Sequence, residues 1–353
     1  MKELTVHTGR SYRIKIERGL INQAGPLIRS VSKAARAAVV TDSNVAPLYA
    51  ERLRASLEAE GFTVSLFVFE AGEGSKRLST VARMYDHFVE HSLSRTDLVV
   101  ALGGGVTGDM AGFAAATYLR GIDFVQIPTS LLAQVDSSVG GKTGVDVDAG
   151  KNLVGAFWQP ILVLIDPDTL STLPKRYFAD GMAEVIKYGC IKSASLFEKV
   201  ASGKAAQQIE QVIYECVDIK RRVVENDERD TGERMLLNFG HTLGHALEKR
   251  YQYQTLSHGE AVGIGMVLMS TAGERRGLTK PGCALRIEQA LQAYGLPVSD
   301  PTSLKELAAN AGADKKSAGH VIRLILLKEI GESYLHTIPR DGLSDFLAGG
   351  IQA

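Results

Sequence analysis

Three histidines in the second half of the chain could bind a metal ion together. His241 and His245 stand four residues apart within residues 236–246, and His258 follows in a second short block. Four residues is about one helical turn, so the first two imidazoles would share a face. Imidazole is a common zinc ligand, and a distant acidic residue often completes such a site. Two solvated helix histidines are the alternative, but the adjacent glycines and the second histidine block favour a catalytic metal site.

A glycine-rich turn in the first half is typical of phosphate binding. The apolar residues 98–102 predict a buried strand, and Gly103, Gly105 and Gly108 follow it with G-x-G-x-x-G spacing. Such a turn, opening a helix, brings backbone N–H groups close to a phosphate. A single match also fits a purely structural turn.

Polar residues at the ends of other predicted strands support a dinucleotide site. The carboxyl ends of parallel strands are where a ribose or a pyrophosphate binds, although each residue could instead be a helix cap or turn residue. These residues follow the strands 37–41, 64–69 and 124–127, and they are Asp42, Asn44, Glu73, Lys76, Thr129 and Ser130.

The segment 136–155 combines many glycines with Lys142, Lys151 and Asn152. Backbone donors and ammonium groups could wrap an anion there. The spacing is not that of a Walker A sequence, which has four residues between its glycines before the lysine. A flexible surface loop with solvated lysines is the alternative.

The order of the predicted elements indicates two domains. Short β-branched segments at 13–17, 37–41, 64–69, 98–102, 124–127 and 161–165 alternate with helical patterns such as 45–60, which predicts a largely parallel sheet covered by helices. From 176 to about 311 the pattern is mostly helical, with strands expected at 321–327 and 333–338. We therefore predict a Rossmann-like α/β domain over 1–175 and a mainly α-helical domain over 176–353.

Composition excludes several classes of protein. The 353 residues include 40 basic and 40 acidic side chains, which leaves no net field to hold a nucleic acid or an anionic membrane. The start of the chain lacks an apolar signal core, and the three cysteines show no C-x-x-C spacing. The expected location is the reducing cytoplasm.

Taken together, these blocks closely resemble the 3-dehydroquinate synthase family. The resemblance covers nearly the whole chain and is most specific at 103–109, 136–146, 151–152, 182–189, 236–246 and 258–261. It implies a homodimer that uses NAD+ and zinc, with cobalt as the alternative metal, on 3-deoxy-D-arabino-heptulosonate 7-phosphate (DAHP). In the shikimate pathway this substrate loses phosphate and is cyclised to 3-dehydroquinate, the precursor of the aromatic amino acids.

The resemblance changes the expected set of metal ligands. It assigns the ion to Glu184, His241 and His258, and it places His245 beside the substrate phosphate, whereas spacing alone pairs His241 with His245. Thr242 stands where a zincin protease would need its glutamate, which argues against peptide hydrolysis.

Other roles follow from the same resemblance, position by position. The phosphate would contact Lys142, Asn152, Asn238, His245 and a lysine of the pair Lys315 and Lys316, for which we choose Lys316. Lys220 and Arg234 would hold the substrate carboxylate, Asp136 and Lys187 the ring hydroxyls, and Arg120 would reach across the dimer interface. Asp230, expected in the same site, replaces a glutamate usual in the family and keeps its carboxylate on a side chain one methylene shorter. NAD+ would contact Asp42, Asn44, Glu73, Lys76, Gly104, Gly105, Val106, Asp109, Thr129, Ser130, Lys142, Lys151, Thr169, Leu170 and Thr172.

The implied reaction oxidises an alcohol transiently, eliminates phosphate, restores the alcohol, opens the ring and closes a carbocycle by an intramolecular aldol step.

Related cyclases are the nearest alternatives: 2-deoxy-scyllo-inosose synthase typically lacks the segment 140–146, whereas aminodehydroquinate synthase differs mainly in its substrate. A metal-dependent polyol dehydrogenase would not need Lys142, Lys151 or Arg234. A non-catalytic relative would not need the full set of Glu184, Lys187, His241 and His258.

Overall fold

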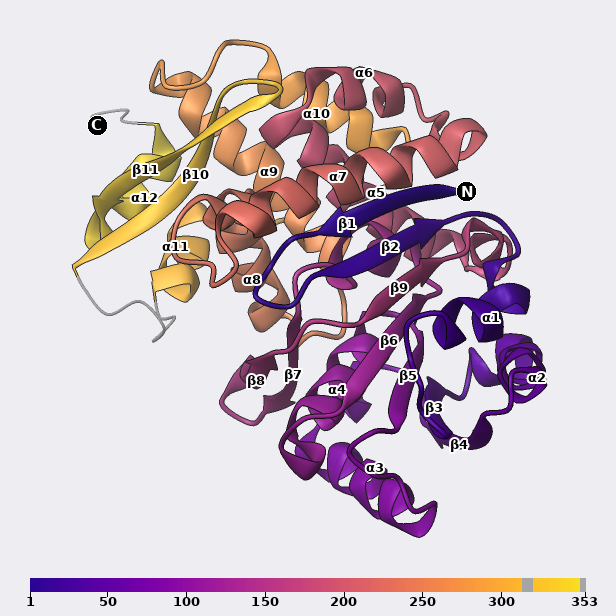
Figure 1. The fold of residues 1–353 in the computed structure, drawn as a ribbon. Coiled ribbons are helices and arrows are strands. Elements are labelled where there is room, and N and C mark those ends of the chain that lie inside the picture. The colour runs from indigo at the N-terminus through magenta and orange to yellow at the C-terminus, as the bar shows by residue number, and fades with distance from the viewer. Residues whose placement is uncertain (313–319, 350–353) are drawn as a thin grey trace. The chain divides into compact units, whose positions relative to one another are not determined.

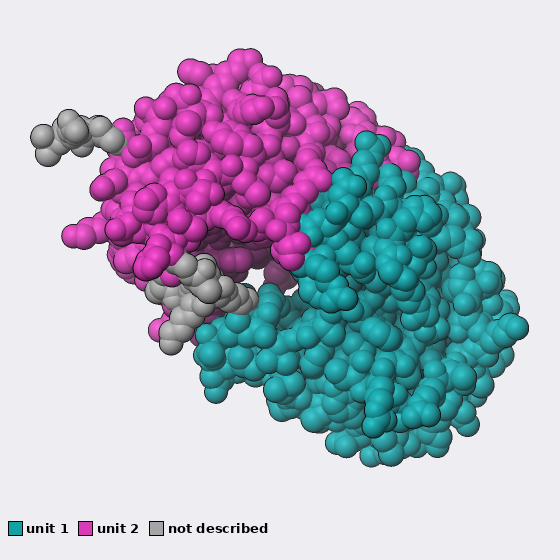
Figure 2. All heavy atoms as spheres, turned by 60° about the vertical axis from the view of Figure 1, so that its left-hand side comes forward, with its two compact units in different colours: residues 1–174, 220–229 teal, residues 175–219, 230–353 magenta. Residues whose placement is uncertain are grey.

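The described chain divides into two compact units (Figure 2). The computed structural model describes residues 1–312 and 320–349. The first unit comprises Met1–Pro174 and Lys220–Arg229, and the second comprises Lys175–Ile219 and the described residues from 230 onward. The division therefore falls within helix α7 (Ile209–Asn226), whose residues from Lys220 belong to the first unit.

The first unit is built on a seven-stranded sheet (Figure 1). Its strands lie in the order β1 (Lys2–Val6), β2 (Tyr12–Ile16), β9 (Leu162–Ile165), β6 (Asp123–Pro128), β5 (Leu98–Gly103), β3 (Arg36–Asp42) and β4 (Thr63–Phe69). Within this sheet, β1 and β2 pair antiparallel, and the other neighbouring strands pair parallel. The predicted, largely parallel sheet is confirmed. Because β3, β5 and β6 are parallel, the polar residues at their carboxyl ends lie at the same edge of the sheet.

Helices cover both faces of this sheet, which explains its continuous apolar strands. Val39 and Val100 pack with helices α1 (Ala24–Arg29) and α2 (Glu51–Ala59) on one face. Val40 and Val99 pack with helices α3 (Leu78–Glu90) and α4 (Gly105–Thr117) on the other. Neighbouring residues of one strand thus enter opposite cores, as the alternation of side chains along a strand requires.

The turn from β5 to α4 needs its glycines for packing as well as for any ligand. A Cβ atom on Gly103 would lie 2.4 Å from the Thr107 hydroxyl, and one on Gly108 would lie 2.7 Å from Oε1 of Gln126. Gly104 is the residue before the helix, and Gly105 is its first residue. The predicted strand–turn–helix unit is therefore confirmed, and two of its glycines have a structural reason.

The glycine-rich segment 136–155 contains a β-hairpin, which we did not predict. Strands β7 (Lys142–Val147) and β8 (Gly150–Phe157) pair antiparallel, with Gly144 opposite Gly155. A Cβ atom on Gly155 would lie 2.1 Å from the carbonyl oxygen of Thr143. The glycines thus allow two backbones to approach, and they interrupt the alternation by which a strand is recognised in sequence.

The second unit is mainly helical, as predicted. It contains α5 (Lys175–Lys192), α6 (Ala194–Ala201), η8 (Glu233–Asn238), α8 (His241–Arg250), α9 (His258–Arg275), α10 (Cys283–Gln292), α11 (Leu304–Gly312) and α12 (Leu343–Ala348). Strands β10 (Val321–Glu329) and β11 (Glu332–Pro339) form the expected antiparallel pair. Among the described helices, none combines the length and the apolar character that crossing a bilayer requires.

A buried carboxylate joins the starts of two central strands and makes stability depend on pH. Asp97 is 1% exposed and accepts hydrogen bonds from the amide of Arg36 at 2.8 Å and from the amide and hydroxyl of Ser94 at 2.7 Å. Burial alone would raise the pKa of Asp97, but these hydrogen bonds outweigh it and lower the pKa below its usual value.

Replacement of Asp97 by asparagine is therefore expected to destabilise the protein by about 1–3 kcal/mol at neutral pH. Because the folded pKa is depressed, this contribution is present above the unfolded pKa of about 3.9 and is lost as pH falls through the folded pKa. Urea unfolding midpoints at pH 7 and near pH 3 measure it. An equal difference between the variant and the unaltered protein at both pH values would contradict the assignment.

Candidate functional site

One face of helix α5 carries three buried ionisable side chains. Asp180, Glu184 and Lys187 follow one another at spacings of four and three residues, and they are 9%, 0% and 1% exposed. The Lys187 ammonium forms a close ion pair with Oε2 of Glu184. Burying an unpaired charge costs free energy, so the charged groups on this face need partners of opposite charge or a bound ion.

The start of helix α8 lies against helix α9 with almost no side chain between the backbones. Gly240 precedes α8 at φ 81°, a conformation that favours glycine. A Cβ atom on Gly265 of α9 would lie 2.1 Å from the carbonyl oxygen of Gly240. This approach carries His241, the first residue of α8, to the side of α9.

The start of helix α9 is fixed by a capping box and by α5. The Ser257 side chain accepts from the amide of Glu260, and the Glu260 carboxylate accepts from the amide of Ser257. Asp180 of α5 accepts a hydrogen bond from the amide of Gly259. These contacts hold His258, the first residue of α9, close to Asp180, and Asp180 stands one helical turn before Glu184 on α5.

Glu184, His241 and His258 converge with the geometry of a metal site. Oε1 of Glu184 lies 3.7 Å from Nε2 of His241 and 3.5 Å from Nε2 of His258. One ligand atom from each residue lies within 4.8 Å of the others. Ligands about 2.0–2.2 Å from a tetrahedral zinc ion are about 3.4 Å apart, so this donor set fits zinc.

The hydrogen bonding of His241 suits a metal ligand. Its Nδ1 lies 3.2 Å from the carbonyl oxygen of Phe239, which can only accept, so Nδ1 carries the proton. Nε2 then presents a lone pair towards Glu184. Burial, followed by the nearby Lys187 and His258, holds the pKa of His241 well below its ordinary value, so the ring is neutral.

A second carboxylate, which we did not predict, supports the site from behind. Glu248 of α8 is 3% exposed; its Oε1 lies 3.5 Å from Nδ1 of His258, and its Oε2 lies 3.9 Å from Nε2 of His245. Burial alone would lower the pKa of His258, but Glu184 and Glu248 together outweigh it and raise that pKa to about 10. The signal was present in the sequence, because His241, His245 and Glu248 follow one another at helical spacing.

The pairing expected from spacing alone is not the one that the structure shows. His241 groups with Glu184 and His258, whereas the exposed His245 groups with Glu248 and His258. The four-residue spacing puts both imidazoles on one side of α8, but only the elements packed against α8 decide which partner each one meets.

Further predicted residues of the second unit lie just before α8. Arg234, 2% exposed, and the half-buried Asn238 belong to the short helix η8, and Asp230 precedes it at φ 59°. Lys315 and Lys316 lie outside the described residues. The predicted phosphate ligands are therefore divided, with Lys142 and Asn152 in the first unit and Asn238 and His245 in the second.

Several predicted dinucleotide residues form one polar cluster in the first unit. Lys76 donates to Oδ2 of Asp109 at 2.7 Å and to Oδ1 of Asn152 at 2.6 Å, and Lys151 pairs with Glu73 at 3.3 Å. Burial alone would lower the pKa of Lys76, but Asp109 and Glu73 outweigh it and raise that pKa. The structure thus brings together residues from the segment after β4, from α4 and from β8.

Residues after β3 and β6 flank the start of α4. Asp42 accepts hydrogen bonds from the amides of Asn44 at 2.9 Å and Val45 at 3.0 Å, so it also serves as a turn residue. A Cβ atom on Gly104 would lie 3.5 Å from the Ser130 hydroxyl, and Thr129 donates its amide to the carbonyl oxygen of Gly103.

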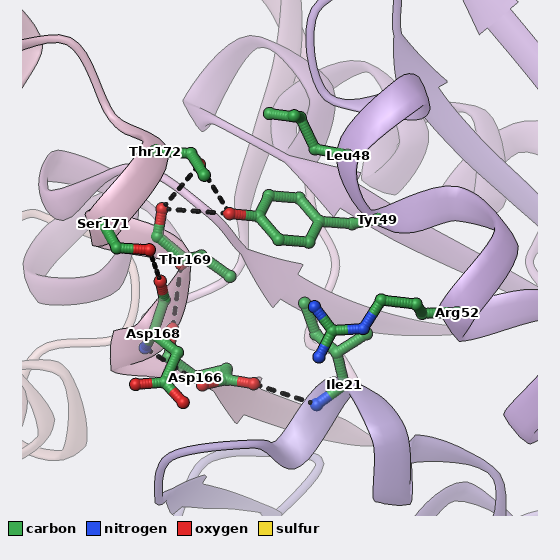
Figure 3. Close-up of a pocket in the computed structure, with 9 residues that line it drawn as sticks. All are labelled: Ile21, Leu48, Tyr49, Arg52, Asp166, Asp168, Thr169, Ser171 and Thr172. Carbon is green, nitrogen blue, oxygen red and sulfur yellow. Dashed lines mark hydrogen bonds between the residues drawn. The ribbon is translucent and has the colours of Figure 1, made fainter.

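Two predicted dinucleotide residues line a pocket of about 240 Å³ in the first unit (Figure 3). The Tyr49 hydroxyl points at Thr169 and Thr172, lying 3.3 Å from the carbonyl oxygen of the former and 2.5 Å from the hydroxyl of the latter. Arg52 lines the same pocket. Tyr49 was not among the predicted residues, because it stands in the apolar pattern of the predicted amphipathic helix 45–60.

The remaining predicted residues lie in the first unit. Lys220 donates to the carbonyl oxygen of Asp136 at 2.8 Å and forms a close ion pair with its carboxylate. Lys142 begins strand β7 with an exposed side chain. Arg120 lies in the turn after α4, at φ 71°, and is exposed.

Comparison with known proteins agrees with this architecture. Family models described as the N-terminal and C-terminal parts of 3-dehydroquinate synthase match residues 66–180 and 181–317. The 3-dehydroquinate synthase of Clostridium beijerinckii is 50% identical over 341 residues, which cover 95% of this chain and 97% of the relative.

Two solved cyclases share the fold. The 2-epi-5-epi-valiolone synthase of Streptomyces hygroscopicus, solved with NAD+ and Zn2+ bound, is similar with a TM-score of 0.86 and 28% identity, covering 98% of each chain. A 2-deoxy-scyllo-inosose synthase, solved with carbaglucose-6-phosphate, NAD+ and Co2+, has a TM-score of 0.87 at 24% identity, covering 99% of this chain and 100% of that one.

The fold is therefore that of the sugar phosphate cyclases. Within this class, the matches to both family models and the 50% identity decide the assignment. The chain belongs to the 3-dehydroquinate synthase family.

Proposed function

We propose that the protein converts DAHP to 3-dehydroquinate and phosphate, with NAD+ recycled and with one divalent metal ion. The observation that carries the proposal is the convergence of Glu184, His241 and His258 in a chain that is 50% identical to a 3-dehydroquinate synthase. The solved relative with NAD+ and Zn2+ supports both cofactors, with Co2+ as the alternative metal.

The side chains around Glu184 would position the reacting alcohol. Bound zinc and NAD+ would together supply polarisation of the alcohol and a reversible hydride transfer. Lys187, held against Glu184, would donate hydrogen bonds to a ring hydroxyl and hold its orientation. Asp136, fixed by Lys220, would contact a second hydroxyl.

The ends of the substrate would be held by cationic and amide side chains. Arg234 has the planar donor set that binds a carboxylate with two hydrogen bonds, and Lys220 would add a charge. Lys142, Asn152, Asn238 and His245 would contact the phosphate. Once substrate and cofactor are bound in this orientation, every later step would take place within one complex, which would remove much of the entropic barrier.

A direct assay distinguishes this function from its alternatives. Purified protein with NAD+, zinc and DAHP is expected to release one phosphate per dehydroquinate without a lasting rise in NADH absorbance. Accumulation of NADH with a simple polyol would instead identify a net dehydrogenase. Faster turnover of the amino analogue of DAHP than of DAHP would identify an aminodehydroquinate synthase.

Glu248 gives a prediction that does not depend on turnover. Its carboxylate faces Nδ1 of His258, so it would fix the tautomer that leaves Nε2 for the metal. Glu248→Gln is expected to weaken zinc binding by about 10–100-fold, as losses of such supporting carboxylates do. Competition with a zinc-binding dye measures this affinity.

A matched control separates this effect from a general loss of charge. Glu306 of α11 is a carboxylate of the same unit, paired with Arg250 at 2.6 Å. Glu306→Gln should bind zinc as the unaltered protein does. Equal zinc affinities of the two variants would remove the supporting role of Glu248.

Two further expectations remain predictions. If the protein is a homodimer in which Arg120 reaches the partner's site, sedimentation should give the mass of a dimer, and Arg120→Ala should lower turnover.

The expected cytoplasmic location would be tested by fractionation of the producing cell.

A further inference from the structure

A group of metal-binding side chains stands on helix α3, which has no role in the proposed reaction. His87 and His91 are one helical turn apart, and Glu90 stands beside them. One ligand atom from each of the three lies within 4.8 Å of the others. All three belong to the first unit, whereas Glu184, His241 and His258 belong to the second.

The two imidazoles are held together by their surroundings. Their ring centroids are 4.1 Å apart, and the Phe67 and His87 rings meet edge to face with their centroids 5.5 Å apart. Nδ1 of His91 lies 2.9 Å from the carbonyl oxygen of His87, which can only accept. Nδ1 of His91 therefore carries the proton, and Nε2 presents a lone pair.

His87 supplies a second, independent observation. Its Nε2 is buried and makes no hydrogen bond within the described part of the chain. Buried polar atoms are normally satisfied, so this unsatisfied one points to a bound ion or water molecule. The exposed Glu90 adds a carboxylate at the same place, and exposed His91 leaves the group open to solvent.

We propose that His87, Glu90 and His91 form a second metal site, specific for a divalent transition ion such as Ni2+, Cu2+ or Zn2+. Two imidazoles with one carboxylate match these borderline ions, whereas Mg2+ and Ca2+ prefer oxygen ligands alone. An ion bound by residues four apart joins successive turns of α3, so it stabilises the end of this helix.

Equilibrium dialysis against Ni2+ tests the proposal. Protein loaded with one equivalent of zinc is dialysed at increasing Ni2+, and both metals are counted by elemental analysis. The unaltered protein is expected to keep its zinc and to take up one Ni2+ per chain. His91→Gln should weaken Ni2+ uptake by about tenfold or more and leave the zinc in place.

His7→Gln is the matched control, because it removes another exposed imidazole of the same unit. It should bind Ni2+ as the unaltered protein does. His91 is exposed, so its replacement should leave the urea midpoint and the cyclase activity unchanged. Absence of any Ni2+ uptake beyond the zinc, or equal uptake by His91→Gln, would overturn the second site without touching the proposed function.

Discussion

His258→Gln is expected to lower turnover by about a thousandfold or more and to abolish tight zinc binding. The variant removes one of three ligand atoms that lie within 4.8 Å of each other. Polarisation of an alcohol by a metal ion contributes several kcal/mol, and about 4 kcal/mol corresponds to a factor of about a thousand. Phosphate release from DAHP and the zinc content after dialysis are the two measurements.

The fold of this variant has to be checked separately. Asp180 and the capping box around Ser257 still hold the start of α9, so the urea midpoint should change little. His7→Gln again serves as the control for loss of an imidazole. A variant that keeps one tightly bound zinc ion and a tenth of the original activity would contradict the assignment of His258.

Arg234→Ala is expected to reduce kcat/KM for DAHP by about 30–1,000-fold, which corresponds to about 2–4 kcal/mol. Arg234 is 2% exposed, so its guanidinium would bind the substrate carboxylate in an environment with little water. The zinc content should stay at one ion per chain, because Arg234 is not among the metal ligands. Steady-state kinetics with varied DAHP measure the effect.

Arg234→Lys separates charge from geometry at the same position. Lysine keeps the positive charge but loses the planar pair of donors, so it should recover only part of the lost kcat/KM. A urea midpoint close to that of the unaltered protein shows that the cavity left by the shorter side chain is tolerated. Unchanged kcat/KM in a folded Arg234→Ala variant would reject the proposed contact.

The parallel sheet was predictable because its strands are short, apolar and separated by helical patterns. The observed β3, β5 and β6 agree with the predicted strands to within one residue at either end. The hairpin of β7 and β8 was not predictable, since its glycines remove the alternation of side chains. The sequence also could not predict that Lys220–Arg229 belong to the first unit, because this assignment depends on contacts with residues far away in the chain.

The candidate site shows the same limit. Spacing placed His241 and His245 on one face of a helix. It could not show that Glu184 of α5 and His258 of α9 lie next to His241. The resemblance to a known family supplied that ligand set. Glu248 was overlooked because a glutamate in a helix is usually solvated, and its helical spacing from His241 and His245 could not show that this one is buried.

The position of one bound zinc ion decides whether Glu184, His241 and His258 are the metal ligands. Crystals of the protein with one equivalent of zinc, measured at the zinc absorption edge, would show the ion as an anomalous peak. We expect a single peak about 2.0–2.2 Å from Oε1 of Glu184 and from Nε2 of His241 and His258. A peak between His245, Glu248 and His258, with Glu184 left outside the coordination sphere, would contradict it.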